Sequence, residues 1–268
     1  MADITDITDI TDGLQFSVHD EVARLTFARP EKKNAITHGM WAGIADAVTA
    51  VEHDPAVKVL VLTGAGADFS AGADISEFGA LRSTAEAAAA YDKAIETAIG
   101  ALAGLRKPTV ALIRGNCIGG GCQISVACDF RFAATGSRFG ITPAKLGIVY
   151  DFQSTRQLVD LVGPAHARYF LLSGSLIDAA RAREIGLLNE VYPDDELDDA
   201  VGEFTSTLCS RSQSSIRGMN RIIEKILTGQ SEPDAEVDRI RLDALHGEDY
   251  AEGVAAFLNR RPPNFTYR

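Results

Sequence analysis

Residues 109–135, TVALIRGNCIGGGCQISVACDFRFAAT, contain a strand–helix–strand unit that is joined by a glycine-rich loop. The apolar start of this stretch predicts a strand that is covered on both faces. The glycines at 119–121 open a short helix, and FRFAAT then returns as a strand. Because a strand–helix–strand order normally connects parallel strands through a right-handed crossover, the stretch predicts an α/β fold.

The sequence upstream repeats this alternation of strands and helices. Residues 14–27 alternate between apolar and polar side chains around a turn, which predicts a β-hairpin. Thr37 can cap a helix, and the apolar run at 57–64 predicts the next buried strand. The S-T-A-E run at 83–86 is a capping box that opens an alanine-rich helix ending near Leu105.

The pattern becomes almost entirely helical from about Asp195. Helices are predicted over 195–209, 213–228, 235–246 and 248–258. We therefore expect a flexible tail at 1–12 that contains an I-T-D repeat, a core at 13–194 that holds the ligand site, and a helical region at 195–268. Helices without a sheet of their own usually pack on a core or a neighbouring subunit, so we expect an oligomer in which this region joins subunits and covers the site.

Composition and charge limit the classes of partner. The chain has 268 residues, 46% of them hydrophobic, and a net charge of −11 with an isoelectric point near 4.9. So acidic a chain repels nucleic acid and anionic membranes, and no apolar run approaches the roughly 18–20 residues of a membrane span. The four cysteines contain no C-x-x-C pair, so we interpret them as reduced thiols of a cytoplasmic protein without a metal site.

Two glycine-rich loops, at 63–75 and 115–122, each follow a buried strand. Phe69 occupies the third glycine position of a dinucleotide-binding loop, and the second loop lacks the Gly-Lys-Ser/Thr of a P-loop. The first N–H groups of a helix have no intrahelical acceptor. Two such donors that converge from different loops would form an oxyanion hole. The alternative is that the glycines only permit tight packing.

Six motifs, in order along the chain, are similar to those of the enoyl-CoA hydratase/isomerase family, the crotonase superfamily. They are ARPEKKNAI (28–36), FSAGADI (69–75), GGGCQ (119–123), FGITPAKLG (139–147), VGPAHA (162–167) and EDYAEGVAAFLNRRPPNF (248–265). The resemblance spans nearly the whole chain after the tail. It implies a crotonase-type spiral of repeated ββα units, a C-terminal helical region, and assembly into trimers or hexamers.

The resemblance also implies an acyl-CoA substrate whose thioester oxygen accepts hydrogen bonds from the backbone N–H groups of Ala73 and Gly120. No separate cofactor is implied, because coenzyme A is part of the substrate. The positions of a basic patch for the CoA phosphates fall on Arg29, Lys32 and Lys33, with a further contribution from Arg260 or Arg261. The other implied substrate-binding positions are Ala35, Ala71, Asp74, Ile75, Gly119, Pro143 and Leu146.

Two departures from the family pattern concern the acid–base groups. Hydratases of the family carry one glutamate at the end of a G-G-G-C-E run and another in F-G-x-P-E-x-x-L-G, where this chain has Gln123 and Pro143. An amide has no useful pKa and proline has no functional side chain, so neither residue is a general acid or base. Gln123 can still orient water or substrate. Hydration by two carboxylates is therefore disfavoured.

Two candidate catalytic groups follow the same motif. Family members with isomerase or dehalogenase chemistry place an aspartate where Asp151 stands, and methylmalonyl-CoA decarboxylase-like members have a tyrosine that matches Tyr150. We therefore expect isomerase or decarboxylase chemistry through an enolate. Asp68 and Glu77 flank the first glycine-rich loop and could substitute for Asp151, the other interpretation being exposed loop charges. Three further alternatives stay open: hydration with Asp151 activating water, acyl-CoA binding without catalysis, and Asp151 as an ordinary solvated loop residue.

Overall fold

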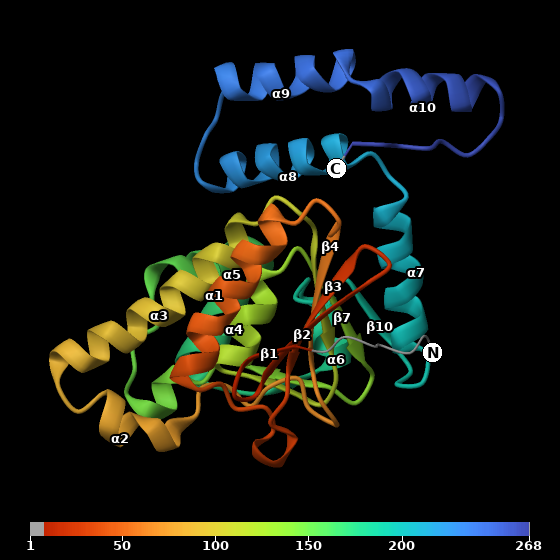
Figure 1. Cartoon of the computed structure of the whole chain (residues 1–268). Helices are drawn as coiled ribbons and strands as arrows, with labels where there is room; N and C mark the ends of the chain where they lie inside the picture. Colours follow the sequence, from red (N-terminus) through yellow and green to blue (C-terminus); the bar gives the residue numbers. More distant parts are fainter. Residues whose placement is uncertain (1–7, 268) are drawn as a thin grey trace.

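A computed structural model describes residues 8–267 and shows a mixed α/β structure built on two β-sheets (Figure 1). The larger sheet has seven strands in the order β1 (Thr8–Thr11), β2 (Leu14–His19), β3 (Val22–Phe27), β4 (Val59–Gly64), β5 (Thr109–Ile113), β7 (Phe130–Ala134) and β10 (Glu190–Tyr192). The pairings of β1 to β3 are antiparallel, and those from β3 to β10 are parallel. The smaller sheet contains β6 (Asn116–Ile118), β8 (Arg138–Gly140) and β9 (Ile177–Asp178). The predicted α/β class is confirmed.

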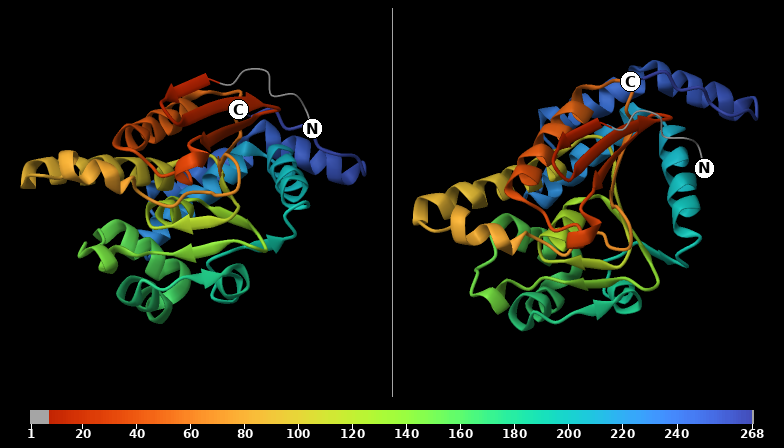
Figure 2. Two further views of the ribbon diagram at one scale, coloured as in Figure 1. Left: turned by 90° about the horizontal axis from the view of Figure 1, so that it is seen from below. Right: turned by 60° about the horizontal axis from the view of Figure 1, so that its bottom comes forward.

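Successive turns of the chain place one strand in each sheet and then a helix. β5 leads into β6 and α4 (Gly120–Ala127), and β7 leads into β8 and, after a short 3₁₀ turn, α5 (Phe152–Ser173). In the earlier turns of the spiral, isolated β-bridges take the place of a full strand. Ser70 pairs in this way with Cys117 of β6, and Ile36 pairs with Ala73. This is the spiral of repeated ββα units predicted from the sequence, and Figure 2 shows its two layers of strands. The spiral brings segments from three successive turns together.

Helices cover the two faces of the larger sheet unequally. α1 (His38–His53), α3 (Ala85–Gly104), α4 and α5 lie on one side of the strands, and α7 (Leu197–Cys209) lies on the other (Figure 1). The larger apolar core lies on the first side and includes Trp41 and Ile44 of α1. A smaller core lies beneath α7, where Leu197 and Val201 pack against strand residues such as Phe132.

Side-chain caps explain where α1 and α3 begin. Thr37 accepts a hydrogen bond from the Met40 N–H at 3.2 Å, so the predicted cap of α1 is confirmed. The cap of α3 is Thr84, which accepts from the Ala87 N–H at 3.2 Å. The capping box had implied Ser83 instead. The Ser83 hydroxyl donates to the Ala80 carbonyl oxygen at the end of α2 (Phe78–Leu81), so it does not cap α3.

The expectation of a flexible tail at 1–12 is wrong for its last part. β1 pairs with β2 in a register that joins Thr8 to Phe16 and Asp9 to Gln15. The β-branched residues of the I-T-D repeat suit a strand, and Asp12-Gly13 between β1 and β2 is a two-residue hairpin signal that could have predicted the pairing. The rest of the predicted tail, residues 1–7, lies outside the described residues.

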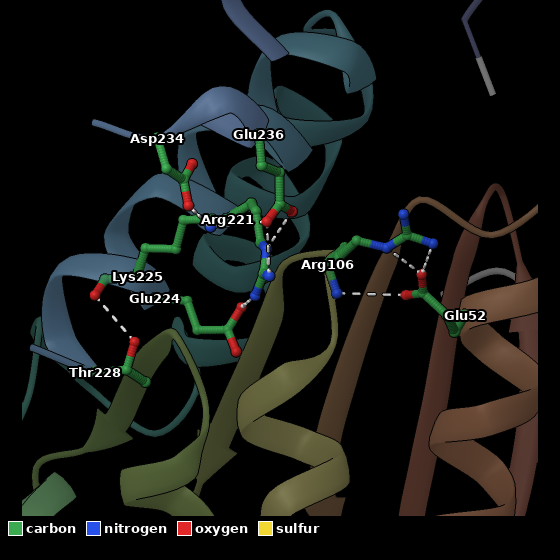
Figure 3. Close-up of polar contacts among 8 residues, drawn as sticks. All are labelled: Glu52, Arg106, Arg221, Glu224, Lys225, Thr228, Asp234 and Glu236. Atoms are coloured by element: carbon green, nitrogen blue, oxygen red, sulfur yellow. Dashed lines mark hydrogen bonds and ion pairs between the residues drawn. The ribbon is translucent and has the colours of Figure 1, made fainter. Parts of the chain in front are cut away.

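The chain after β10 is helical, as predicted. It forms α7, α8 (Gln213–Leu227), α9 (Ala235–His246) and α10 (Glu248–Leu258). Figure 1 shows α8, α9 and α10 as a layer of their own, which α7 connects to the core. Arg221 pairs with Glu236 at 2.8 Å and Lys225 with Asp234 at 2.7 Å, so ion pairs hold α8 to the start of α9 (Figure 3). Over residues 8–267, none of the helices has the length and apolar character needed to cross a membrane.

Candidate active site

One cavity of about 330 Å³ collects most of the predicted site residues. Its lining comes from α1, the loops after β4 and β6, the N-terminus of α4, the segment 142–151, and α2 with α3. The predicted residues that line it are Ala71, Ala73, Ile75, Gly119, Gly120, Gln123, Pro143, Leu146, Tyr150 and Asp151. Those outside the lining are Arg29, Lys32, Lys33, Ala35 and Asp74.

Two backbone N–H groups converge at one end of this cavity. The bridge to Ile36 uses the carbonyl of Gly72 and the N–H of Asp74, so the intervening Ala73 N–H is left free. Gly120 is the first residue of α4, where an N–H has no intrahelical acceptor. Within residues 8–267 neither donor has a hydrogen-bond partner. A Cβ built on Gly120 would lie only 3.4 Å from the Ala73 nitrogen, so the two donors are close neighbours in the wall of the cavity.

The glycines at this point are required by close packing. Gly72 has a φ of +101°, and a Cβ there would lie 2.9 Å from the Ile118 oxygen. A Cβ on Gly120 would lie 2.9 Å from Cζ2 of Trp41, which is fully buried beneath the turn. The two interpretations of the glycines, an oxyanion hole and tight packing, are therefore compatible, because tight packing is what lets the donors approach each other.

Gln123 and Asp151 meet on another side of the cavity. The Gln123 Nε2 donates to Oδ2 of Asp151 at 3.1 Å and to the Ser154 hydroxyl at 2.6 Å. Oδ1 of Asp151 accepts from the Ser154 N–H at 2.8 Å, which makes Asp151 the N-cap of α5. Asp151 is thus a half-buried helix cap and not a solvated loop residue, and its catalytic role stays a prediction. The residue lines the cavity, and each of its two carboxylate oxygens is held by a hydrogen bond.

Tyr150 contributes a buried hydroxyl. Within the described part of the chain this hydroxyl has no hydrogen-bond partner. Burial, with the nearby Cys122 and Asp151, raises the pKa of Tyr150 well above 10, so the phenol is neutral at physiological pH. The hydroxyl is enclosed by protein atoms near the buried Cys122 and Cys117 thiols, so a ligand in the cavity does not contact it in this conformation.

The basic patch differs from the expectation at Arg29. The Arg29 guanidinium pairs with the Asp74 carboxylate at 2.9 Å and also donates to the Ala35 carbonyl at 2.7 Å. Both side chains are largely buried, at 17% and 12% exposure. Arg29 therefore joins its own loop, residues 28–36, to the loop after β4 that contains Asp74. Lys32 and Lys33 are the exposed cations of the segment 28–36. Hydrogen bonds from Ser76 and then from Arg29 lower the pKa of Asp74 against the opposing effect of burial.

The remaining candidates have structural partners. Asp68, considered as a substitute acid, accepts from the backbone and side chain of Asn116 at 2.8 and 2.6 Å. Glu77 accepts from the His38 N–H at 2.8 Å. Arg261 bonds to Glu252 of α10 and, like Arg260, does not line the cavity.

Three contributions to the site were not predicted from the sequence. Trp41 and α3 line the cavity, and Ser154 lies behind it, where it binds Gln123 and Asp151. The D-x-x-S spacing at 151–154 could have indicated the cap before α5. Nothing local could have shown which face of α3 meets the cavity.

The fold and this cavity are those of a crotonase-type protein. The family model for enoyl-CoA hydratase/isomerase matches residues 17–268, and the chain belongs to this family. It is 34% identical over 255 residues to a crotonyl-CoA hydratase of Syntrophomonas wolfei, covering 92% of this chain and 95% of that one. It is 30% identical over 253 residues to the 1,2-epoxyphenylacetyl-CoA isomerase of Escherichia coli, covering 93% and 96%.

Solved structures agree with this assignment. The crystal structure of an enoyl-CoA hydratase/isomerase family protein from Hyphomonas neptunium superposes with a TM-score of 0.92 at 35% identity. The match covers 96% of this chain and 98% of that one. The local similarity to methylmalonyl-CoA decarboxylase-like members stays a prediction.

Proposed function

We propose that the protein is an acyl-CoA isomerase that works through an oxyanion-stabilised enolate with one carboxylate. The observation that carries this proposal is the position of Asp151. Its carboxylate lines the same cavity as the Ala73 and Gly120 donors and is oriented by Gln123 and Ser154. The family membership and the relative named as an isomerase support the acyl-CoA substrate and the reaction class.

The proposed reaction moves one proton within a 3-enoyl-CoA. The thioester oxygen accepts hydrogen bonds from the Ala73 and Gly120 N–H groups, which stabilise negative charge on that oxygen. Asp151 takes the proton from the α-carbon, and the electron pair of that C–H bond enters a dienolate. Asp151 then returns the proton to the γ-carbon, and the double bond shifts to the 2-position. Atoms and electrons balance without a cofactor.

Gln123 acts here as a positioning residue. Its amide donates to Asp151 and cannot itself carry the proton. The hydrogen bond holds one carboxylate oxygen of Asp151 in place and so orients the group that accepts the α-proton. The catalytic contribution of Gln123 is thus made through Asp151.

Two other reactions have specific support. Hydration, with Asp151 activating a water molecule, is supported by the relative named as a crotonyl-CoA hydratase. Decarboxylation of a malonyl-type thioester is supported by the place of Tyr150 in the cavity wall, and it requires the enclosed hydroxyl to turn toward the departing carboxylate. Against decarboxylation, Asp151 in the same cavity would repel an anionic substrate. Binding of acyl-CoA without turnover is the non-catalytic alternative.

Turnover in D₂O distinguishes all four functions. The purified protein is offered a 3-enoyl-CoA, crotonyl-CoA, and malonyl- and methylmalonyl-CoA, and product mass is followed. Isomerisation gives double-bond migration with at most solvent-exchanged deuterium and no added water. Gain of one D₂O would establish hydration instead, and loss of CO₂ would establish decarboxylation. Binding of every thioester with no change in any would refute catalysis.

The proposal includes an assembly of identical subunits in the cytoplasm. Apolar side chains are exposed on the C-terminal layer, including Phe257 at 84% and Leu258 at 74%. Such a surface is typical of a face that another subunit covers. We propose a trimer or hexamer, which native mass spectrometry tests directly. All four cysteines are free thiols, which supports a reducing compartment.

A further inference from the structure

The α2–α3 side of the cavity carries charged residues that the proposed reaction does not use. Arg82, Asp92 and Glu96 all line the cavity. Asp92 and Glu96 are four residues apart on α3, so they project from the same side of that helix. Together with Asp151 they place three carboxylates against one guanidinium in the lining. The cavity therefore has an excess of negative charge.

Arg82 is not available to offset this excess. It forms an ion pair with Asp92, and its guanidinium lies 4.8 Å from the ring centre of Phe78 and 5.2 Å from that of Tyr91. Its side chain is only 16% exposed. A guanidinium fixed between a carboxylate and two aromatic faces is held away from a ligand and is already neutralised.

Glu96 retains its charge toward the cavity. Its cationic neighbour is Lys93, whose ammonium lies 3.7 Å away on a side chain that is 74% exposed. An exposed pair at that distance is weak, because water and salt screen it. Lys93 does not line the cavity.

We propose that this charged wall selects acyl groups that have no terminal carboxylate, with Arg82, Asp92 and Glu96 as its specificity-determining residues. The inference rests on the proposed acyl-CoA function and narrows its substrate class. An acyl carboxylate would enter a partly enclosed cavity whose net charge has the same sign, and it would be repelled. An uncharged acyl group of equal length meets no such repulsion.

Equilibrium binding of two saturated thioesters tests the proposal without requiring turnover. Hexanoyl-CoA and adipyl-CoA have the same number of acyl carbons and differ in a terminal carboxylate. By calorimetry at low ionic strength, adipyl-CoA should bind more weakly by on the order of tenfold. The ratio should shrink as salt is added, because screening weakens repulsion between charges that water can reach.

Variants assign the effect to the wall. Glu96→Gln removes one carboxylate without freeing Arg82, and it should reduce the adipyl-CoA penalty several-fold while hexanoyl-CoA affinity stays the same. Glu203→Gln is the matched control, since it makes the same charge change at an exposed position of α7 outside the cavity. The control should leave the ratio of the two affinities unchanged.

Each contrary outcome has a distinct meaning. Equal affinities in the unaltered protein, or a ratio that Glu96→Gln does not move, would overturn the selectivity. Tighter binding of adipyl-CoA that Arg82→Gln abolishes would also overturn it and make Arg82 a carboxylate receptor. Failure of both thioesters to bind would refute the acyl-CoA function itself, whereas hexanoyl-CoA binding with no preference would refute only this inference.

Discussion

The side-chain amide of Gln123 donates a hydrogen bond to the Asp151 carboxylate at 3.1 Å. A glutamate at position 123, as in the hydratase pattern, would bring two hydrogen-bond acceptors face to face. The amide instead fixes one oxygen of Asp151, while the Ser154 N–H fixes the other. The absent glutamate at 123 and the aspartate at 151 are therefore parts of one arrangement.

Replacement of Gln123 by glutamate should move the pH dependence of turnover. A second carboxylate beside Asp151 raises the pKa of the pair, so the ionised base forms only at higher pH. The acid limb of kcat/KM should shift upward by about one pH unit or more, with a rate loss of about tenfold on that limb. Gln123→Met, which adds no charge, should shift the limb less. If the acid limb of kcat/KM lies at the same pH in Gln123→Glu as in the wild type, the contact between residues 123 and 151 is contradicted.

The oxyanion assignment is tested by a pair of substitutions at Gly120. Gly120→Pro removes the N–H at the first position of α4, where proline suits a helix. Turnover should fall by roughly 10²–10³. Gly120→Ala introduces a Cβ at the same crowded position near Trp41 but keeps the donor. Equal losses in the two variants would show that crowding, and not the N–H, matters.

Asp151→Asn should separate chemistry from stability. Asparagine caps helices as well as aspartate does, so the free energy of unfolding should change by less than about 0.5 kcal/mol. The amide cannot shuttle a proton, so kcat should fall by at least about 10² while affinity for the thioester changes little. Denaturant titration and steady-state kinetics give the two readouts. Wild-type turnover in this variant would remove Asp151 from the mechanism.

The Tyr150 hydroxyl distinguishes isomerisation from decarboxylation. Tyr150→Phe removes a buried donor that has no partner in the described structure, so the protein should be unchanged or more stable by about 1 kcal/mol. The one-carboxylate isomerisation does not use this group, so its rate should stay within about twofold. A large loss of turnover with stability preserved would instead favour the decarboxylase scheme.

The Arg29–Asp74 clamp should make stability depend on pH in acid. The pKa of Asp74 is lowered in the folded state, so its contribution is present above the ordinary pKa of about 3.9. The contribution is lost as the pH falls through the lower folded value. Asp74→Asn should therefore cost about 1–3 kcal/mol at pH 7, with the cost shrinking below pH 4.

Urea titrations at both pH values measure the difference between wild type and Asp74→Asn. Asp46→Asn, at an exposed position of α1, is the control and should change stability by less than about 0.5 kcal/mol. A cost for Asp74→Asn that is equal at pH 7 and pH 3 would show that the ionised carboxylate adds nothing to the clamp.

The sequence predicted those parts of the molecule that local pattern controls. The hairpin at 14–27, the cap at Thr37 and the four C-terminal helices depend on periodicity and on neighbouring residues, and all are present. The two glycine-rich loops after buried strands could be predicted as well, and residues of both line the cavity.

What the sequence did not predict depends on contacts between distant residues. Arg29 and Asp74 are 45 positions apart, and only the spiral brings them together. β1 is the exception, because its partner β2 follows after only Asp12 and Gly13, and that Asp-Gly pair is a local hairpin signal. Asp92 and Glu96 lie on a helix that was predicted, but the face that meets the cavity is set by tertiary packing.

The double use of Asp151, as helix cap and as facing carboxylate, has an evolutionary consequence. Aspartate, asparagine, serine and threonine all satisfy the first position of a helix, so a single codon change there preserves folding. Natural selection on stability alone would not remove such a change. Under the proposed mechanism, lineages of this chain can therefore lose their reaction while keeping a ligand-binding scaffold, which leaves descendants free to acquire sensing or regulatory roles.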